Sequence, residues 1–191
     1  SRTWRLNSEG STNGDFITVQ DLDSNRGVVY SNYRSGGTNR IIAYHSWDDF
    51  EDADRNTNAP NIIMTGSLDG NVSAIKVSPF TTDSSTIFVG TESGSVFKVT
   101  NADTADANDN STANWSNITG SQFLGSVSDI EFGKDENHIF VTFHNYGVEN
   151  IFYSEDGGQS WTEKEGNLPD IPVRCILQNP LSLNEVIIGT E

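Results

Sequence analysis

The chain has 191 residues, of which 34% are hydrophobic, so it is long enough to bury a core and lacks the composition of a disordered or fibrous protein. It carries 27 acidic and 11 basic residues, a formal net charge of −16. This charge repels phosphate backbones and anionic lipid headgroups, so nucleic acid and anionic membranes are not expected partners. No apolar run reaches the length of a membrane span, and membrane insertion is therefore not expected.

The first elements in chain order are short β-branched or aromatic runs separated by turn residues. They predict four strands, near residues 16–19, 28–33, 40–44 and 61–64. Trp4 lies where the last strand of a still earlier four-stranded unit would begin. The N-terminal third of the chain is therefore predicted to form one divergent four-stranded unit, preceded by part of another.

A Val-x-x-Ile phrase then occurs three times, starting at Val72, Val127 and Val173. Each phrase follows a glycine-containing approach and leads, 12 to 15 residues after its valine, to a second β-branched run. These second runs lie at 87–91, 139–143 and 186–190. Third strands are predicted at 95–99 and 150–153, and fourth strands open at Trp115 and Trp161.

Four-stranded units that return about every 45–55 residues, without helical periodicity, predict an all-β fold of the β-propeller type. A β-sandwich also has short alternating strands, but it does not explain the repeated order of motifs. We predict about three four-stranded blades plus two partial blades in an incomplete ring. The expected blades are 1–15 (partial, last strand), 16–71, 72–126, 127–172 and 173–191 (partial, first two strands).

The segment 154–161 resembles the Asp-box, S-x-D-x-G-x-[ST]-W, of BNR-repeat propellers. Its matching residues are Ser154, Asp156, Gly157, Gly158, Ser160 and Trp161. The aspartate can accept backbone N–H bonds in its own turn, the glycines permit positive φ, and the tryptophan can pack between strands. Proteins with this motif include sialidases, xyloglucan-cleaving hydrolases and sortilin-type receptors. The resemblance implies that the motif is structural and lies on the propeller rim.

The two ends of the chain also resemble interrupted repeats. Residues 1–4 resemble the tail of another Asp-box, and the run at 186–190 resembles the second strand of a further blade. We therefore expect an interior piece of a larger ring. The open edges of such a piece could pair with another chain.

Two acidic segments, 48–54 and 103–110, are the candidate cation sites, because oxygen-rich loops can bind Ca²⁺. A weak calcium site is predicted at Asp103, Asp106, Asn108 and Asp109, although the spacing is not that of an EF-hand loop. No other cofactor is expected. The three histidines are widely spaced, and the single cysteine, Cys175, lies in an apolar run and is expected to be buried and inert.

These observations favour a non-enzymatic, secreted or cell-surface propeller that binds a glycan or protein partner. The alternative is part of a BNR-repeat glycoside hydrolase. Such an enzyme needs two carboxyl groups across the scissile bond, and the sequence offers many acids without selecting a pair. The arginine cluster with which sialidases bind their substrate carboxylate is not apparent among the seven arginines.

Overall fold

The computed structural model describes residues 17–45, 62–64, 66, 68–104 and 113–191. Within these residues the chain forms fourteen β-strands and one short 3-10 helix, η1 (Ala102–Thr104). The prediction of an all-β protein is confirmed. In the part of the chain that the structure describes, no helix is long and apolar enough to cross a membrane.

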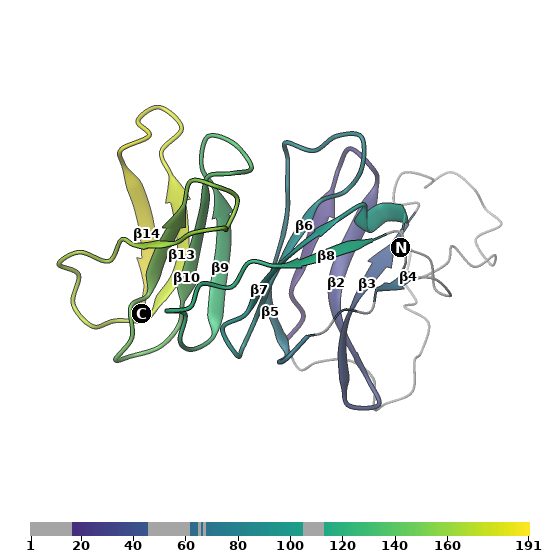
Figure 1. The fold of residues 1–191 in the computed structure, drawn as a ribbon, viewed down its shortest axis with the longest axis horizontal. Helices are drawn as coiled ribbons and strands as arrows, with labels where there is room; N and C mark the ends of the chain where they lie inside the picture. The colour runs from purple at the N-terminus through teal and green to yellow at the C-terminus, as the bar shows by residue number, and fades with distance from the viewer. Residues whose placement is uncertain (1–16, 46–61, 65, 67, 105–112) are drawn as a thin grey trace, which may run out of the picture.

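Three antiparallel sheets of four strands and one sheet of two strands follow one another, each with its strands in chain order (Figure 1). The first sheet contains β1 (Gln20–Asp23), β2 (Val28–Ser35), β3 (Thr38–Tyr44) and β4 (Ile62–Met64). The second contains β5 (Val72–Val77), β6 (Ile87–Thr91), β7 (Val96–Thr100) and β8 (Asn114–Asn117). The third contains β9 (Val127–Phe132), β10 (Ile139–Phe143), β11 (Ile151–Ser154) and β12 (Thr162–Glu163). The two-stranded sheet contains β13 (Val173–Gln178) and β14 (Val186–Thr190).

The first strand of each sheet contacts the first strand of the next, so that β1, β5, β9 and β13 form a continuous series. We refer to these four as the inner strands. Sheets arranged radially around inner strands are the architecture of a β-propeller, and the chain forms part of one. The four sheets fall within the predicted blades 16–71, 72–126, 127–172 and 173–191. The predicted partial blade 1–15 lies outside the described residues, and the blade boundaries stay predictions.

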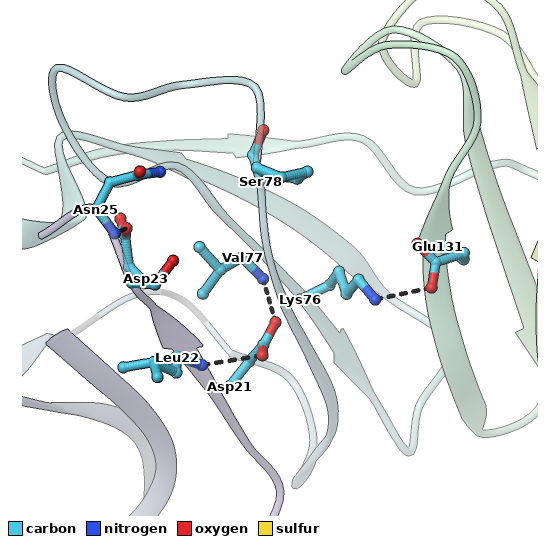
Figure 2. Close-up of a pocket in the computed structure, with 10 residues that line it drawn as sticks. Asp21, Leu22, Asp23, Asn25, Lys76, Val77, Ser78 and Glu131 are labelled. Atoms are coloured by element: carbon cyan, nitrogen blue, oxygen red, sulfur yellow. Dashed lines mark hydrogen bonds and ion pairs between the residues drawn. The ribbon is translucent and has the colours of Figure 1, made fainter. Parts of the chain in front are cut away.

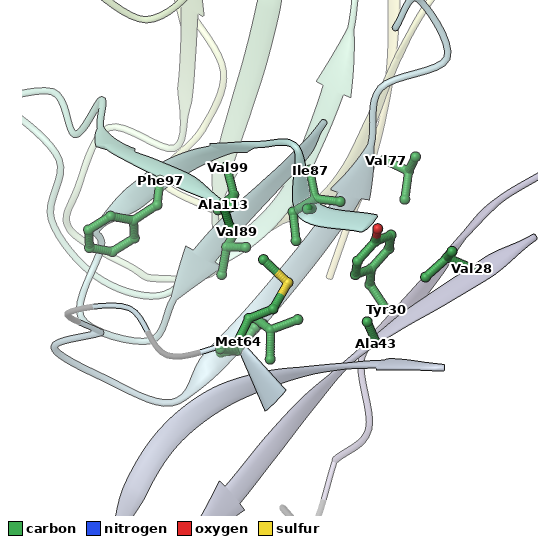
Figure 3. Packing of buried hydrophobic residues seen from close by; sticks show 13 residues of the cluster. Val28, Tyr30, Ala43, Met64, Val77, Ile87, Val89, Phe97, Val99 and Ala113 are labelled. Carbon is green, nitrogen blue, oxygen red and sulfur yellow. The ribbon is translucent and has the colours of Figure 1, made fainter. Parts of the chain in front are cut away.

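Successive sheets pack face to face, and the hydrophobic core lies between them. Figure 3 shows the first layer, in which Tyr30 and Met64 of the first sheet meet Ile87, Val89 and other residues of the second. The middle strand β6 is buried on both faces, because the second sheet lies between the first and the third. Its sequence is accordingly a continuous apolar run rather than an alternating pattern.

Strand β6 illustrates how alternate residues serve two layers. Ile87 and Val89 belong to the core between the first and second sheets, whereas Phe88 belongs to the core between the second and third. Phe88 is fully buried and makes an edge contact with Phe132, with ring centroids 5.1 Å apart. A third layer joins Phe140 and other residues of the third sheet to β13 and β14.

Each repeat of the Val-x-x-Ile phrase has the same irregularity. The pairing of β5 with β6, of β9 with β10 and of β13 with β14 shifts register next to the opening valine. A β-bulge of this kind redirects side chains and increases local twist. At one of these bulges, the Ser128 hydroxyl donates to the carbonyl of Val173 on the next inner strand, at 2.6 Å. The bulge therefore links two neighbouring sheets.

Glu136, in the β9–β10 loop, joins the third sheet to the second. Its Oε1 accepts from Lys98 Nζ at 2.6 Å, and its Oε2 accepts from the hydroxyls of Ser78 at 2.5 Å and Thr81 at 2.6 Å. Burial raises the pKa of Glu136, but these three hydrogen bonds and the charge of Lys98 outweigh burial and hold the pKa below its usual value. The carboxylate is thus ionised at neutral pH.

Two expectations from the sequence were wrong. The first strand begins at Gln20, beyond the apolar stretch that ends at Val19, because the carboxylates of Asp21 and Asp23 accept hydrogen bonds from the second sheet and make a polar strand stable. Cys175 is exposed rather than buried. Among the described residues, the two-stranded sheet packs on one face against the third sheet, and residues on its other face are accessible.

Candidate functional site

The inner strands bring charged residues together in a cleft of about 290 Å³ (Figure 2). Asp21 comes from β1, Lys76 from β5 and Glu131 from β9. The cleft is completed by the segments 22–25 and 77–79. It therefore spans the junctions of three consecutive sheets.

Each charged group of the cleft is held by a defined partner. Asp21 Oδ2 accepts from the Val77 amide at 2.7 Å, and its Oδ1 accepts from the Leu22 amide at 2.9 Å. Lys76 Nζ forms an ion pair with Glu131 Oε2 at 2.7 Å. Figure 2 shows the two side chains pointing toward each other. Acceptor, donor and acceptor groups thus follow one another across the inner strands.

The electrostatics of the cleft stabilise the ammonium group of Lys76. Burial lowers the pKa of Lys76, but the hydrogen bond and charge of Glu131, with the charges of Asp21 and Asp129, outweigh it and raise the pKa above its usual value. Lys76 is therefore a permanent cation at neutral pH. Three carboxylates surround it, so the local net charge is negative.

Asp129 lies two residues before Glu131 on β9 and contacts the following sheet. Its Oδ2 accepts from the Ile176 amide at 3.1 Å, and its Oδ1 accepts from the Ile130 amide at 2.9 Å. Burial raises the pKa of Asp129, and the nearby charge of Glu131 adds to this, although both backbone bonds act in the opposite direction. Burial thus makes protonation of Asp129 easier than that of an exposed aspartate.

The six residues that resemble an Asp-box run from Ser154, the last residue of β11, through the β11–β12 turn. Ser154 Oγ donates to Asp156 Oδ1 at 2.8 Å. Ser160 donates to Asp156 twice, from its amide at 2.9 Å and from its hydroxyl at 2.6 Å. These bonds, with those from Ser160 the strongest, lower the pKa of Asp156 to about 2. The Asp156 carboxylate therefore stabilises the turn in which it lies.

The remaining members of the turn contact the preceding sheet. Gly157 and Gly158 have φ angles of 73° and 90°. A Cβ on Gly158 would lie 2.8 Å from Ile118, so the backbone of the turn approaches that side chain closely. Trp161 Nε1 donates to the Ile118 carbonyl at 2.8 Å, and its ring lies 5.0 Å from that of Phe123. None of the six residues lines the cleft.

The predicted calcium ligands are only partly described. Asp106, Asn108 and Asp109 lie outside the described residues. The carboxylate of Asp103 is 2.8 Å from Arg26 Nε and accepts from the Ser85 amide at 2.8 Å. Asp103 therefore links the first two sheets.

The histidines are not gathered in one place. His138 Nδ1 lies 2.6 Å from Asp135 Oδ1, and His144 Nε2 lies 2.9 Å from Glu191 Oε1. Burial lowers the pKa of His45. Among residues 17–45, 62–64, 66, 68–104 and 113–191, no three histidine, cysteine or acidic side chains are grouped as metal ligands.

The sequence did not single out Asp21, Lys76 or Glu131. A signal was present, because Lys76 and Glu131 follow the isoleucine of their Val-x-x-Ile phrases at the same position. A charged residue inside an otherwise apolar strand indicates a polar partner on the adjacent element. The identity of that partner depends on the packing of sheets that are about 55 residues apart in the chain.

No protein-family model matches the chain, and no curated protein matches it. Among solved structures, the chain is similar to the GH74 xyloglucanase from Xanthomonas campestris, with a TM-score of 0.55 and 11% sequence identity. The match covers 83% of this chain and 24% of the xyloglucanase chain. The chain thus spans about a quarter of the enzyme that it resembles. At this level of identity the similarity concerns the fold, and the β-propeller architecture predicted from the repeats is shared with that enzyme.

Proposed function

We propose that this chain is part of a non-enzymatic, secreted or cell-surface propeller that binds glycans through the cleft on its inner strands. The observation that carries the proposal is the series of Asp21, Lys76 and Glu131, in which fixed acceptors flank a fixed donor. A sugar hydroxyl both donates and accepts a hydrogen bond, so two adjacent hydroxyls match such a series. A cleft of about 290 Å³ is also close to the lower end of small-ligand sites.

The negative local charge favours a neutral glycan over an anionic one. Asp21 and Glu131 would accept from hydroxyl groups, and the remaining N–H groups of Lys76 would donate to a hydroxyl oxygen. The β11–β12 turn would have a structural role, since the bonds made by Asp156 stay within the turn and Trp161 packs on the preceding sheet. The weak calcium site at Asp103, Asp106, Asn108 and Asp109 stays a prediction, and the glycan site does not require it.

The test is binding of soluble neutral polysaccharides, hydroxyethylcellulose and galactomannan, measured by affinity gel electrophoresis. Lys76→Met should weaken binding at least about tenfold, because a hydrogen bond to a charged group contributes about 1.5–3 kcal/mol. Lys76→Arg should retain part of the affinity, and Lys134→Met, at an exposed position in the β9–β10 loop, should leave it unchanged. Equal binding by wild type and Lys76→Met, with both folded, would refute a role for the cleft.

A glycoside hydrolase is the second candidate. The observation in its favour is that two acidic residues, Asp129 and Glu131, lie two positions apart on β9. A hydrolase needs one carboxyl group that keeps its proton, and burial raises the pKa of Asp129, which lies two residues from Glu131 on the same strand. Both residues lie on one strand, however, and Asp129 is directed to the Ile176 amide of the next sheet. Release of reducing sugar that Asp129→Asn abolishes, in a folded variant, would establish this candidate in place of the first.

A further inference from the structure

Four aromatic rings pack together in the outer part of the third sheet. The ring of Phe123 lies 5.0 Å from that of Phe143 and 4.8 Å from that of Phe152, measured between centroids. It also lies 5.0 Å from the ring of Trp161, whose Nε1 donates to the Ile118 carbonyl at 2.8 Å. The chain's own side chains therefore fill this layer, and the polar atom of the tryptophan is satisfied.

The second sheet has the same layer with two of the four rings replaced. The amide after β6 donates to the carbonyl of Asn71, and the amide after β10 donates to the carbonyl of Ser126, so this shared bond aligns the two sheets. The four positions in the second sheet are then Leu68, Thr91, Phe97 and Trp115. A leucine and a threonine thus stand where the third sheet has two phenylalanines, and both side chains are smaller.

A pocket of about 340 Å³ lies in this layer of the second sheet. It is lined by Asp69, Phe97, Trp115 and Asn117. The rings of Phe97 and Trp115 stand edge to face with centroids 6.1 Å apart, and Figure 3 shows Phe97 at one end of the core layer. Strand β8, which holds Trp115 and Asn117, is the edge of the sheet opposite β5, so this pocket is separate from the cleft on the inner strands.

Asp69 gives the pocket a fixed hydrogen-bond acceptor. Its Oδ2 accepts from the Ser95 hydroxyl at 2.6 Å, and its Oδ1 accepts from the Thr91 hydroxyl at 3.2 Å. The two hydroxyl-bearing residues are buried, so the carboxylate is anchored from the side of the sheet. Among the described residues that line the pocket, Asp69 is the only charged one, and an anionic ligand would be repelled.

Two further groups are hydrogen-bond donors. Trp115 Nε1 is buried and has no hydrogen-bond partner in the described part of the chain, whereas the equivalent indole of the third sheet is satisfied by a carbonyl. A buried donor without an acceptor is unfavourable, so an oxygen atom of a ligand would compensate it. Asn117 Oδ1 already accepts from the Thr119 amide at 2.9 Å, and Asn117 therefore offers the pocket its NH₂ group.

The lining selects a class of ligand. A pyranose has hydroxyl groups that both donate and accept, and it has apolar C–H bonds that pack on the face of an aromatic ring. An organic ammonium ion would suit the carboxylate and the rings, but it offers the two donors no acceptor. A volume of about 340 Å³ is at the lower end of small-ligand sites, which matches a single sugar ring.

We propose that this pocket binds one ring of a neutral sugar, with Asp69 as the acceptor and with Trp115 and Asn117 as donors. The ligand occupies space that two phenylalanine rings fill in the third sheet. This inference goes beyond the proposed function and does not depend on it, because the ligand class follows from the lining of this pocket alone.

The test is titration of the ¹⁵N-labelled chain with methyl β-D-glucopyranoside, methyl β-D-galactopyranoside and methyl α-D-mannopyranoside. The indole N–H signal of Trp115, identified by its loss in Trp115→Phe, should shift and saturate with at least one of the three. The residues that line the inner-strand cleft include no tryptophan, so this signal reports on the pocket. Lys76→Met should leave the titration unchanged, which separates this site from the cleft.

Three variants test the lining. Leu68→Phe restores a ring that the third sheet has, and it should abolish the shift at sugar concentrations that saturate the wild type. Asn117→Ala, at an exposed position, should raise the dissociation constant about 2- to 12-fold, the factor for loss of one hydrogen bond. Ser116→Ala, also exposed and on the opposite face of β8, should leave it unchanged. Thermal unfolding verifies that each variant is folded.

The outcomes decide the proposal without reference to the cleft. An unchanged titration in folded Leu68→Phe overturns the pocket; if this variant does not fold, wild-type affinity in Asn117→Ala overturns it. No shift with any of the three glycosides also overturns it, and binding of polysaccharide through Lys76 would still stand. A shift of the Trp115 signal with benzylammonium but with none of the glycosides would assign the pocket to an organic cation instead.

Discussion

Glu136→Gln should destabilise the contact between the second and third sheets. The amide oxygen can still accept from Ser78 and Thr81, which both bond to Oε2, but an NH₂ group would replace Oε1 and face the ammonium of Lys98. The side chains of Lys98 and Glu136 are only 23% and 19% exposed, so solvent screens their interaction weakly. The variant should therefore lose about 1.5–3 kcal/mol of unfolding free energy, the contribution of a hydrogen bond to a charged group.

Thermal unfolding followed by tryptophan fluorescence measures this loss. For a chain of this size, the expected decrease in Tm is about 3–12 °C. Glu155→Gln, at an exposed position in the β11–β12 turn, removes the same charge and should leave Tm nearly unchanged. This control separates the local contact from the general effect of lowering the net charge of −16.

The pH dependence of the difference provides the stricter test. Because the folded-state pKa of Glu136 is lowered, its carboxylate stabilises the protein above the unfolded-state pKa of about 4.3, and this stabilisation is lost as pH falls through the folded-state pKa. The difference in Tm between wild type and Glu136→Gln should therefore be full at pH 7 and decrease below about pH 4. Equal Tm values at pH 7, or a difference that widens with acidification, would refute this explanation.

Three further predictions concern the core and the β11–β12 turn. Phe88→Ala should cost about 3–5 kcal/mol in urea unfolding, because it leaves a cavity between two sheets; a loss below about 1 kcal/mol would mean that the sheets are not packed here. Gly158→Ala should be more destabilising than Gly157→Ala, since both positions have positive φ but only the former brings a Cβ to 2.8 Å from Ile118; the reverse order would contradict the close approach. The Asp156 carboxyl should titrate near pH 2 by NMR, and a midpoint near 4 would show that its hydrogen bonds are not formed.

The sequence predicted the fold because the repeating residues are those that form the core. The valines of the three phrases lie buried between sheets, as do Ile130 and Ile176, and Ile75 is partly buried against the core. The runs that follow, such as β6 and β10, are buried on both faces and are therefore apolar throughout. Periodicity and β-propensity detect such strands directly.

The departures from prediction have a common physical cause. Strand β1 is polar because Asp21 accepts from the Val77 amide of the next sheet, and this compensation depends on tertiary packing. Cys175 is exposed because burial of an apolar strand requires a neighbour on both faces, and within the described part of the chain its sheet packs against another sheet on one side only. In each case the local sequence indicates that a strand forms, but it does not indicate which element packs against that strand.

The candidate site lies where the repeats differ rather than where they agree. The isoleucine of the three phrases is followed by Lys76, Glu131 and Leu177, and the position before it holds Ala74, Asp129 and Cys175. These variable positions are directed to the next sheet or to solvent: Lys76 contacts Glu131, Asp129 accepts from the following strand, and Leu177 is 53% exposed. A repeat fold needs the invariant positions for packing and leaves the variable ones free to change. The proposed glycan binding should therefore depend on the variable positions of the inner strands and on the loops that follow them.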